Sequence, residues 1–553
     1  MRIGLLTEGG YPYATGEARL WCDRLVRGLA HHEFEIYALS RSAHQEEQGW
    51  VQLPHQVQRV RTAPLWTPED DGRTYGRRER RRFALHFKQL VAAICAGDDP
   101  DAPERFAAGL YGLAELARDE GGLYAALRSE VAVRALESAC RAPGASRAVQ
   151  AAQVPDFLVF VDQLERALRP LSLDWFEQAD GGLGGVDLCH ATSGGTAALP
   201  GLLAKRFFGV PLLVTEYGVH LRAHYLDRAD GRLSVPVRAL LAAFHGKLAS
   251  EVYRQAALIT PGNTHARRWQ ERCGADRAKL RTVYPGMEEE RFTAVGEGED
   301  RGDPHTLVWV GRIEPAKDLI ALLHAFAEVR KEEPAARLRI FGAPARGPEG
   351  ATYLAHCRAL AAQLFPDEAA DALTMGDNPV SFEGIGGPET PEPADAYAAG
   401  SVVVLSSVVE GFPLSLVEAM FCGRATVSTD VGAVCEVIGG TGLVVPPRNP
   451  RALADTCLAL LRDPERRERL GAAARARALE LFTVEQNIAA FRSIYLELIS
   501  HCPVRREAVG HDGEPLPFAR PPEARFPGRW TGGAPSWADR PVGVGTTSAE
   551  AGR

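Results

Sequence analysis

Short apolar runs alternate with longer stretches of helical periodicity over most of the chain. The first half opens with an apolar run, a loop rich in Gly and Tyr from 8 to 16, and an amphipathic stretch from about 20 to 30. Apolar runs of strand length in this half cover residues 3–7, 34–39, 186–190, 211–215 and 258–260. Strands that alternate with helices favour an α/β architecture built on parallel sheets.

The second half repeats this alternation. Its predicted strands cover residues 306–310, 338–341, 380–382, 402–405, 425–429 and 443–445. Its predicted helices cover residues 319–332, 414–421 and 450–461. A last helix, from 483 to 499, carries an apolar stripe at helical spacing, made of Ile488, Phe491, Ile494, Tyr495 and Leu498.

The first predicted domain is Rossmann-like and covers residues 1–297. Strand signals fade between 63 and 180, where Ala- and Leu-rich helical patterns predict a helical insertion. The insertion opens with an arginine-rich run at 73–82, which we interpret as a solvated helical face in preference to an anion or membrane contact.

A charged, Gly-rich stretch at 296–304 predicts a linker to a second Rossmann-like domain at 298–482. The last helix, taken as 483–500, is expected to pack back on the first domain. Pro, Gly, Arg and Ser dominate 501–553 without apolar periodicity, so this tail is expected to be disordered.

Composition agrees with a chain of several globular domains. The chain has 553 residues, of which 45% are hydrophobic, and single cores stop growing at about 250–300 residues. A net charge of −8 and an isoelectric point near 6.1 argue against nucleic acid as a principal partner.

The cysteines and the N-terminus predict a cytoplasmic protein. The ten cysteines contain no CxxC pair and no regular framework, which favours reduced thiols. The apolar stretch at the N-terminus is too short for a signal peptide. No apolar run approaches the roughly 20 residues of a membrane span.

The best candidate active site lies where the apolar run 402–405 gives way to a helical pattern. Glu410 falls on the intervening loop, and Glu418 falls in the first turns of the helix. A strand end followed by a helix N-terminus can bind phosphate. The two carboxylates are then placed to face opposite ends of an elongated ligand such as a nucleotide sugar. Solvated carboxylates at a helix start are the structural alternative.

A second cluster follows the strand predicted at 306–310. Gly311 lets the backbone approach a ligand, and Arg312 and Lys317 can converge on a pyrophosphate. Lysine is scarce in this arginine-rich chain, although an Arg-x4-Lys spacing alone also fits a solvated pair.

Together these clusters resemble the C-terminal half of the retaining glycosyltransferases of family four, which have the GT-B fold. The resemblance rests on Gly311 to Lys317, the strand and loop 402–410, the pair Glu410 and Glu418, the run 429–432, Glu436 and the run 442–447. Four N-terminal motifs, at 7–13, 190–193, 215–218 and 284–287, are similar to the Pel-exopolysaccharide glycosyltransferase subgroup, which also carries a helical insertion.

The resemblance implies two Rossmann-like domains that face a central cleft, with donor bound mainly by the second and acceptor by the first. It implies retaining transfer of a hexose from an NDP-sugar, with UDP-glucose or a related UDP-sugar expected, to a polysaccharide or glycoconjugate. No cofactor and no metal are expected, since fixed cations and helix amides can stabilise the leaving diphosphate.

Site roles follow from the same resemblance. Arg312 and Lys317 would neutralise the donor diphosphate, Glu410 would hold hydroxyls of the sugar, and Glu418 would accept hydrogen bonds from the ribose. We expect the catalytic set to be Glu410, Arg312 and Lys317. The donor-binding set adds Gly411, Phe412, Pro413, Leu414 and Glu418.

Gly16, His190, Tyr217 and His220 are candidate acceptor or sugar contacts on the first domain. For His190 and His220 a hydrogen-bonded structural histidine is an equal alternative. Two positions depart from the subgroup: Tyr217 replaces a usual His, and Glu17 follows Gly16 where a second Gly is common. A carboxylate near a diphosphate is repulsive unless it turns away or meets a cation.

Two alternatives stay open at this point. A nucleotide-sugar epimerase would share the fold and need no acceptor, and a catalytically weak scaffold would bind a nucleotide sugar without turnover. The expected partners are the donor and a saccharide acceptor, with no nucleic acid. Peripheral association with a membrane polysaccharide synthase is compatible with the resemblance.

Overall fold

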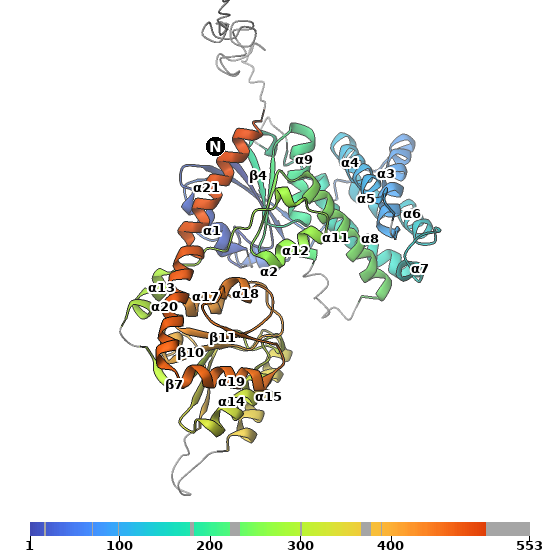
Figure 1. Ribbon diagram of the computed structural model, residues 1–553. Coiled ribbons are helices and arrows are strands. Elements are labelled where there is room, and N and C mark those ends of the chain that lie inside the picture. Colours follow the sequence, from blue (N-terminus) through green and yellow to red (C-terminus); the bar gives the residue numbers. More distant parts are fainter. Residues whose placement is uncertain are drawn as a thin grey trace, which may run out of the picture. The chain divides into compact units, whose positions relative to one another are not determined.

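The computed structural model describes residues 1–15, 18–68, 70–97, 99–176, 182–221, 233–298, 301–366, 378–388 and 390–504. Residues Met1–Cys502 form one compact unit, which contains two six-stranded sheets (Figure 1). Every strand pairing within these sheets is parallel. The predicted α/β fold class is confirmed.

The first sheet has the strand order β3-β2-β1-β4-β5-β6. Its strands are β1 (Arg2–Glu8), β2 (Glu33–Ser40), β3 (Val57–Pro64), β4 (Leu188–Ala191), β5 (Leu212–Glu216) and β6 (Leu258–Pro261). The helices of this lobe outside the insertion are α1 (Arg19–Gly28), α2 (Ala43–Glu47), α9 (Leu199–Phe208), α11 (Val235–Gln255) and α12 (Thr264–Arg272). The next helix, α13 (Glu290–Glu297), packs against the second lobe, where Phe292 joins the core.

The edge strand β3 was not predicted from the sequence. Half of its side chains are polar, with Arg59 and Arg61 among them, and all but Ala63 are half-buried or exposed. An edge strand lacks a neighbour on one side and needs little apolar character, so its hydrophobic signal is weak.

Helices fill the described chain between β3 and β4. They are α3 (Arg77–Cys95), α4 (Ala102–Glu120), α5 (Leu123–Leu127), α6 (Glu130–Cys140), α7 (Arg147–Gln150) and α8 (Val154–Leu168). Figure 1 shows them gathered beside α11, which contacts α3, α4, α7 and α8. Phe83, Phe87 and Leu90 of α3 are buried, whereas the arginines at its start are mostly exposed.

The second sheet has the order β12-β11-β10-β7-β8-β9. Its strands are β7 (Asp303–Val310), β8 (Arg337–Phe341), β9 (Val380–Glu383), β10 (Gly400–Leu405), β11 (Ala425–Thr429) and β12 (Leu443–Val445). The helices of this lobe are α14 (Leu319–Glu332), α15 (Pro348–Leu364), α16 (Pro393–Ala398), α17 (Leu414–Phe421), α18 (Val434–Ile438), α19 (Pro450–Leu461) and α20 (Pro464–Leu481).

Alternate residues of β10 supply two apolar cores, one on each face of this sheet. Val402 and Val404 join the core with α14 and α19, and Val403 and Leu405 join the core with α17 and α20. β10 is buried along its whole length, as expected for a central parallel strand. Its carboxyl end is therefore a rigid base for the loop that follows.

The segment between α13 and β7 is shorter than the predicted linker at 296–304. Gly296 lies inside α13, which ends at Glu297, and β7 begins at Asp303. A Cβ on Gly296 would lie 2.3 Å from the carbonyl oxygen of Phe421. This glycine allows α13 to approach α17 closely. The glycine that contributed to the linker prediction is therefore needed for close packing and not for flexibility.

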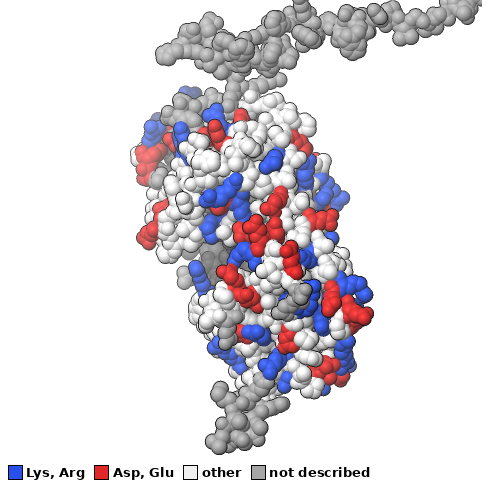
Figure 2. All heavy atoms as spheres, turned by 90° about the vertical axis from the view of Figure 1, so that its left-hand side faces the viewer, with Lys and Arg blue, Asp and Glu red and all other residues white. Residues whose placement is uncertain are grey.

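The last helix, α21 (Val484–His501), packs against the first sheet. Its apolar stripe joins the core formed by β1, β2 and α1, where Phe491 and Tyr495 are fully buried. The expected tail overlaps this helix at His501, and residues 505–553 lie outside the described chain. Basic and acidic side chains are interspersed over the face that lies on the left of Figure 1 (Figure 2).

Candidate functional site

Loops from two neighbouring strands, β7 and β10, are joined at the carboxyl edge of the second sheet. The backbone N–H of Val408 donates to the carbonyl oxygen of Ala316 over 2.9 Å. The Ser406 hydroxyl donates to the carbonyl oxygen of Lys317 over 2.7 Å. Loops at this edge form the binding crevice of open parallel sheets, so their polar side chains are candidates for ligand contact.

A third loop, which follows β11, closes on the loop after β10. The backbone N–H of Ala433 donates to the carbonyl oxygen of Gly411 over 3.1 Å. Gly432 has a φ of +58°, and a Cβ there would lie 2.4 Å from the carbonyl oxygen of Glu410. Both the backbone conformation and the close contact require glycine at this position.

Lys317 and Glu410 come together from the first two loops. The Lys317 ammonium pairs with Glu410 Oε1, which also accepts a hydrogen bond of 2.7 Å from the Ser407 hydroxyl. The Glu410 side chain is only 8% exposed, and that of Lys317 is 18% exposed. Such burial makes the pairing more than a surface contact, because partly buried charges are screened less by solvent.

Arg312 lies on the same loop as Lys317 but is exposed. Within the described chain its guanidinium has no ion pair, so it is available to an anion. The preceding Gly311 donates its backbone N–H to the carbonyl oxygen of Phe341 over 3.0 Å, which fixes the start of the loop.

Glu418 occupies a separate environment on α17. Tyr397 Oη donates to Glu418 Oε2 over 2.7 Å. Burial raises the pKa of Glu418 above its usual range. Glu410 and Glu418 therefore have different partners, one a lysine and a serine, the other a tyrosine.

The stretch between the two glutamates presents backbone to the site. A Cβ on Gly411 would meet no atom within 4 Å. Pro413 is the residue before α17, and no side chain caps this helix start. Leu414, the first helical residue, is 52% exposed. The Phe412 ring lies 5.7 Å from that of Phe482, measured between centroids.

This arrangement is suited to a diphosphate and a neutral polar group joined to it. The positive end of the α17 dipole, which no side chain caps, favours phosphate oxygens. Arg312 and Lys317 add charge-assisted donors. The carboxylate of Glu410, next to the lysine, can accept hydrogen bonds from hydroxyl groups.

His190, on the first lobe, is fully buried at the end of β4. Its Nδ1 lies 2.7 Å from Tyr495 Oη, and its Nε2 lies 2.7 Å from Thr215 Oγ1. Burial lowers its pKa to about 3, so the ring is neutral. In this structure His190 joins α21 to the sheet, and no part of its side chain is open to an acceptor.

Tyr217 also contacts α21. Its Oη accepts a hydrogen bond of 2.9 Å from Asn487 Nδ2, and its ring packs edge-on against Trp21 at 5.2 Å between centroids. The position where the resemblance led us to expect a histidine therefore holds the last helix through a hydroxyl group.

His220 is half-buried and packs against His245 of α11, at 5.1 Å between ring centroids. A Cβ on Gly195 would lie 2.9 Å from His220 Cδ2, so the ring lies over the loop after β4. Of the four predicted acceptor contacts, Gly16 lies outside the described residues, as does its neighbour Glu17.

Sequence reasoning assigned no role to Glu216, although it ends a buried strand. Its carboxylate accepts a 2.8 Å hydrogen bond from the backbone N–H of Gly194 and one of 3.0 Å from Gln270 Nε2. Tyr253 Oη also donates to it. These contacts fix the loop after β4 beneath His220. The available signal was a charged residue at the end of the apolar run 211–215.

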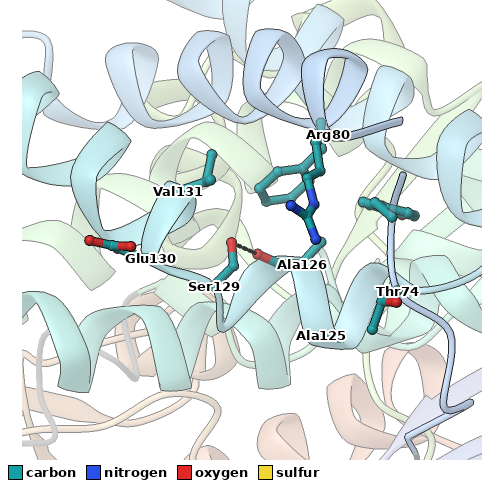
Figure 3. A pocket seen from close by; sticks show the side chains of 9 residues that line it. Thr74, Arg80, Ala125, Ala126, Ser129, Glu130 and Val131 are labelled. Atoms are coloured by element: carbon teal, nitrogen blue, oxygen red, sulfur yellow. Dashed lines mark hydrogen bonds between the residues drawn. The ribbon is translucent and has the colours of Figure 1, made fainter. Parts of the chain in front are cut away.

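A cavity of about 340 Å³ lies within the helical insertion (Figure 3). Figure 3 shows Arg80 extending from α3 toward Ala126, while Ser129 donates a hydrogen bond to the carbonyl oxygen of Ala126. The donor residues predicted from the sequence do not line this cavity. It is separate from the loops described above.

Comparisons with known proteins agree with this geometry. Residues 304–463 match the domain described as "Glycosyl transferases group 1", and residues 1–278 match a domain of unknown function, DUF3492. The chain is 31% identical to D-inositol 3-phosphate glycosyltransferase of Kribbella flavida over 309 residues, which is 53% of this chain and 68% of that protein. This chain belongs to the group 1 glycosyltransferases.

A relative of the same name from Kineococcus radiotolerans is 34% identical over 243 residues, or 40% of this chain and 54% of that protein. The glycosyltransferase thus spans between about half and two thirds of these two curated relatives. Both relatives are named for group transfer, which favours transfer over the epimerase alternative.

Solved structures identify the fold. Sucrose-phosphate synthase from Thermosynechococcus elongatus is similar with a TM-score of 0.53 and 16% identity, over 90% of this chain and 99% of that one. Anabaena Alr3699/HepE in complex with UDP has a TM-score of 0.54 and 14% identity, over 90% and 100%. The glycosyltransferase therefore has the two-domain GT-B fold. None of its described helices is both long and apolar enough to cross a membrane.

Proposed function

We propose that this glycosyltransferase transfers a hexose from a UDP-sugar to a hydroxyl of a polysaccharide or glycoconjugate, with retention of anomeric configuration. The observation that carries the proposal is the meeting of Lys317 and Glu410 at the carboxyl edge of the second sheet, beside the uncapped start of α17. Cations and the positive end of a helix dipole suit a diphosphate, and an adjacent buried carboxylate suits the sugar joined to it.

Each donor-site residue has a distinct proposed role. Arg312 and Lys317 bind the diphosphate and stabilise the negative charge that develops as it leaves. Lys317 has three N–H donors, so it can bind phosphate oxygen without releasing Glu410. Glu410 then binds sugar hydroxyls, and Glu418 accepts hydrogen bonds from the ribose.

The proposed mechanism needs no separate protein base. The acceptor hydroxyl attacks on the face from which the diphosphate leaves, and a phosphate oxygen takes its proton. The new glycosidic bond forms as the bond from the anomeric carbon to the phosphate oxygen breaks. We propose that donor binding and the reaction are independent of metal; the titration below tests binding, and release of UDP from UDP-glucose with and without EDTA tests the reaction.

The nature of the donor and acceptor is also part of the proposal. The HepE structures contain UDP and, in one case, UDP-glucose, which supports a uridine nucleotide. The curated relatives are named for D-inositol 3-phosphate, and the N-terminal motifs resemble the Pel-exopolysaccharide subgroup. An inositol phosphate and oligosaccharides are therefore the acceptors to compare first.

Calorimetric titration with UDP, ADP, GDP and TDP, and with their glucose conjugates, tests the donor site. We expect UDP and UDP-glucose to bind equally well with and without EDTA. Lys317→Ala should weaken UDP binding by about 1.5–3 kcal/mol, the range for a hydrogen bond to a charged group.

Lys331→Ala is the matched control, because this lysine is exposed on α14 and pairs with Glu328. It should leave UDP affinity unchanged. Equal affinity in wild type and Lys317→Ala would contradict the placement of the diphosphate. Release of UDP from UDP-glucose in the presence of inositol 3-phosphate or oligosaccharides then identifies the acceptor, and binding without any release would favour the weak scaffold.

A further inference from the structure

Glu436 of α18 holds Thr264 of the first lobe and Tyr284, which lies between the two lobes and packs against the core of the second. Its Oε2 accepts hydrogen bonds from the backbone N–H of Thr264, over 2.7 Å, and from the Thr264 hydroxyl, over 2.6 Å. Its Oε1 accepts a 2.9 Å hydrogen bond from Tyr284 Oη. Thr264 is the first residue of α12, where the helix dipole also favours a carboxylate.

On its own side, Glu436 is fixed to the second lobe. The Arg477 guanidinium of α20 donates to the carbonyl oxygens of Glu436 and Val437, each over 2.8 Å. The last turn of α18 is therefore held by a side chain of another helix. A carboxylate on such a base cannot follow α12 unless the surrounding loop moves as well.

The loop that leads into α18 is the one that contacts the donor residues. Its Gly432 lies against the backbone of Glu410, and its Ala433 bonds to Gly411. Only two residues separate Ala433 from Glu436. A displacement at Glu436 is thus transmitted directly to the backbone that carries the proposed sugar-binding carboxylate.

Tyr284 provides a second route between the same parts. Its ring lies 6.3 Å from that of Phe412, between centroids, and Phe412 belongs to the loop between the two glutamates. Burial raises the pKa of Tyr284 to about 12, with a further contribution from Glu436. The hydroxyl is therefore protonated at neutral pH and donates to the carboxylate.

We propose that Glu436 is a positioning residue that couples the donor loops of the second lobe to the start of α12 and to Tyr284. Through this coupling, occupation of the donor site orders the acceptor-side lobe. The inference rests on the proposed function, because it assigns the donor to the loops around Glu410 and Lys317.

Hydrogen exchange with and without saturating UDP tests the coupling. In the wild-type protein we expect UDP to slow amide exchange at residues 264–267, although its proposed contacts lie in the second lobe. In Glu436→Ala this slowing should be lost, while UDP affinity stays within about twofold. Release of UDP from UDP-glucose should fall by about tenfold or more, as expected for misplaced reacting groups.

Thr264→Val and Tyr284→Phe each remove one hydroxyl and keep the size of the side chain. Each should partly reduce the slowing of amide exchange that UDP causes at residues 264–267. These two variants test the coupling if Glu436→Ala does not fold. Glu468→Ala, at an exposed position of α20, should behave as wild type.

Two results would overturn the inference and leave the donor site standing. In one, UDP binds the wild-type protein without affecting residues 264–267. In the other, UDP slows exchange there equally in Glu436→Ala. A wild-type protein that binds no UDP would instead remove the proposed function and the inference together.

Discussion

His190 shows how one side chain links burial to pH. Its ring is enclosed by Thr215 and Tyr495, with a pKa near 3. In the unfolded chain a histidine titrates near 6.5. Between these values the unfolded state binds a proton that the folded state does not, so stability is lost as the pH falls below about 6.5.

We therefore expect protonation of this residue in the unfolded state to lower the free energy of unfolding by about 1 kcal/mol when the pH falls from 7.5 to 5.5. Urea denaturation at the two pH values measures the loss. His190→Gln has no proton to gain and should show a smaller pH dependence. His31→Gln, at an exposed position, is the control. An identical pH dependence in wild type and His190→Gln would contradict the effect of burial.

Lys317 and His190 also show how far the role of a residue can be predicted from the sequence. Lys317 was predicted to bind the diphosphate from its loop after a strand, and His190 to contact acceptor or sugar from the resemblance. Lys317 meets Glu410 as the order of parallel strands requires. The partner of His190 is Tyr495, more than 300 residues away. A contact with the last helix has no local signal, so the sequence could not decide between an acceptor contact and a hydrogen-bonded structural histidine.

At the scale of elements, the loop after β11 depends on one glycine. Gly432 combines a φ of +58° with a close contact to Glu410, whereas Gly440 has a φ of +89° and open space around its Cα. Substitution at Gly440 introduces backbone strain alone, whereas substitution at Gly432 adds a steric contact with Glu410. A side chain in the left-handed region costs about 1–2 kcal/mol.

Gly432→Ala should lower stability by more than Gly440→Ala, since its Cβ also pushes the loop of Glu410 away. It should also weaken UDP binding, whereas Gly440→Ala should not. Thermal unfolding and calorimetric titration of both variants provide the comparison. Equal UDP affinity in the two variants would indicate that this loop does not support the donor site.

Most elements could be predicted because parallel strands covered on both faces give continuous apolar runs. The exceptions have physical reasons. β3 is an edge strand in which polar residues, with Arg59 and Arg61 among them, interrupt the apolar ones, so it has no continuous apolar run. Gly296 suggested a linker but serves the contact of α13 with Phe421. Composition does not distinguish a glycine needed for flexibility from one needed for close packing.

At the scale of the whole molecule, α21 completes the core of the first lobe. Phe491 is fully buried and lies 5.8 Å from Trp21 and 5.4 Å from His190, between ring centroids. Removal of a buried phenylalanine side chain costs about 3–5 kcal/mol. Leu496, on the same helix, is 55% exposed.

Phe491→Ala should therefore lower the urea midpoint of the first lobe strongly, whereas Leu496→Ala should change stability by less than about 0.5 kcal/mol. Hydrogen exchange of α1 at increasing urea concentration follows this lobe, because Trp21 of α1 lies next to the substituted side chain. Similar midpoints in the two variants would show that α21 contributes little to the core.

The position of α21 has a consequence for synthesis on the ribosome. The first sheet ends with β6 at Pro261, yet its core is completed by side chains from Ile488 onward. At about 5–20 residues per second, these side chains follow roughly 10–45 s later. During that interval the apolar surface that α21 later covers is exposed on the nascent first lobe. Chaperones that bind nascent chains can therefore bind this surface until α21 has been synthesised.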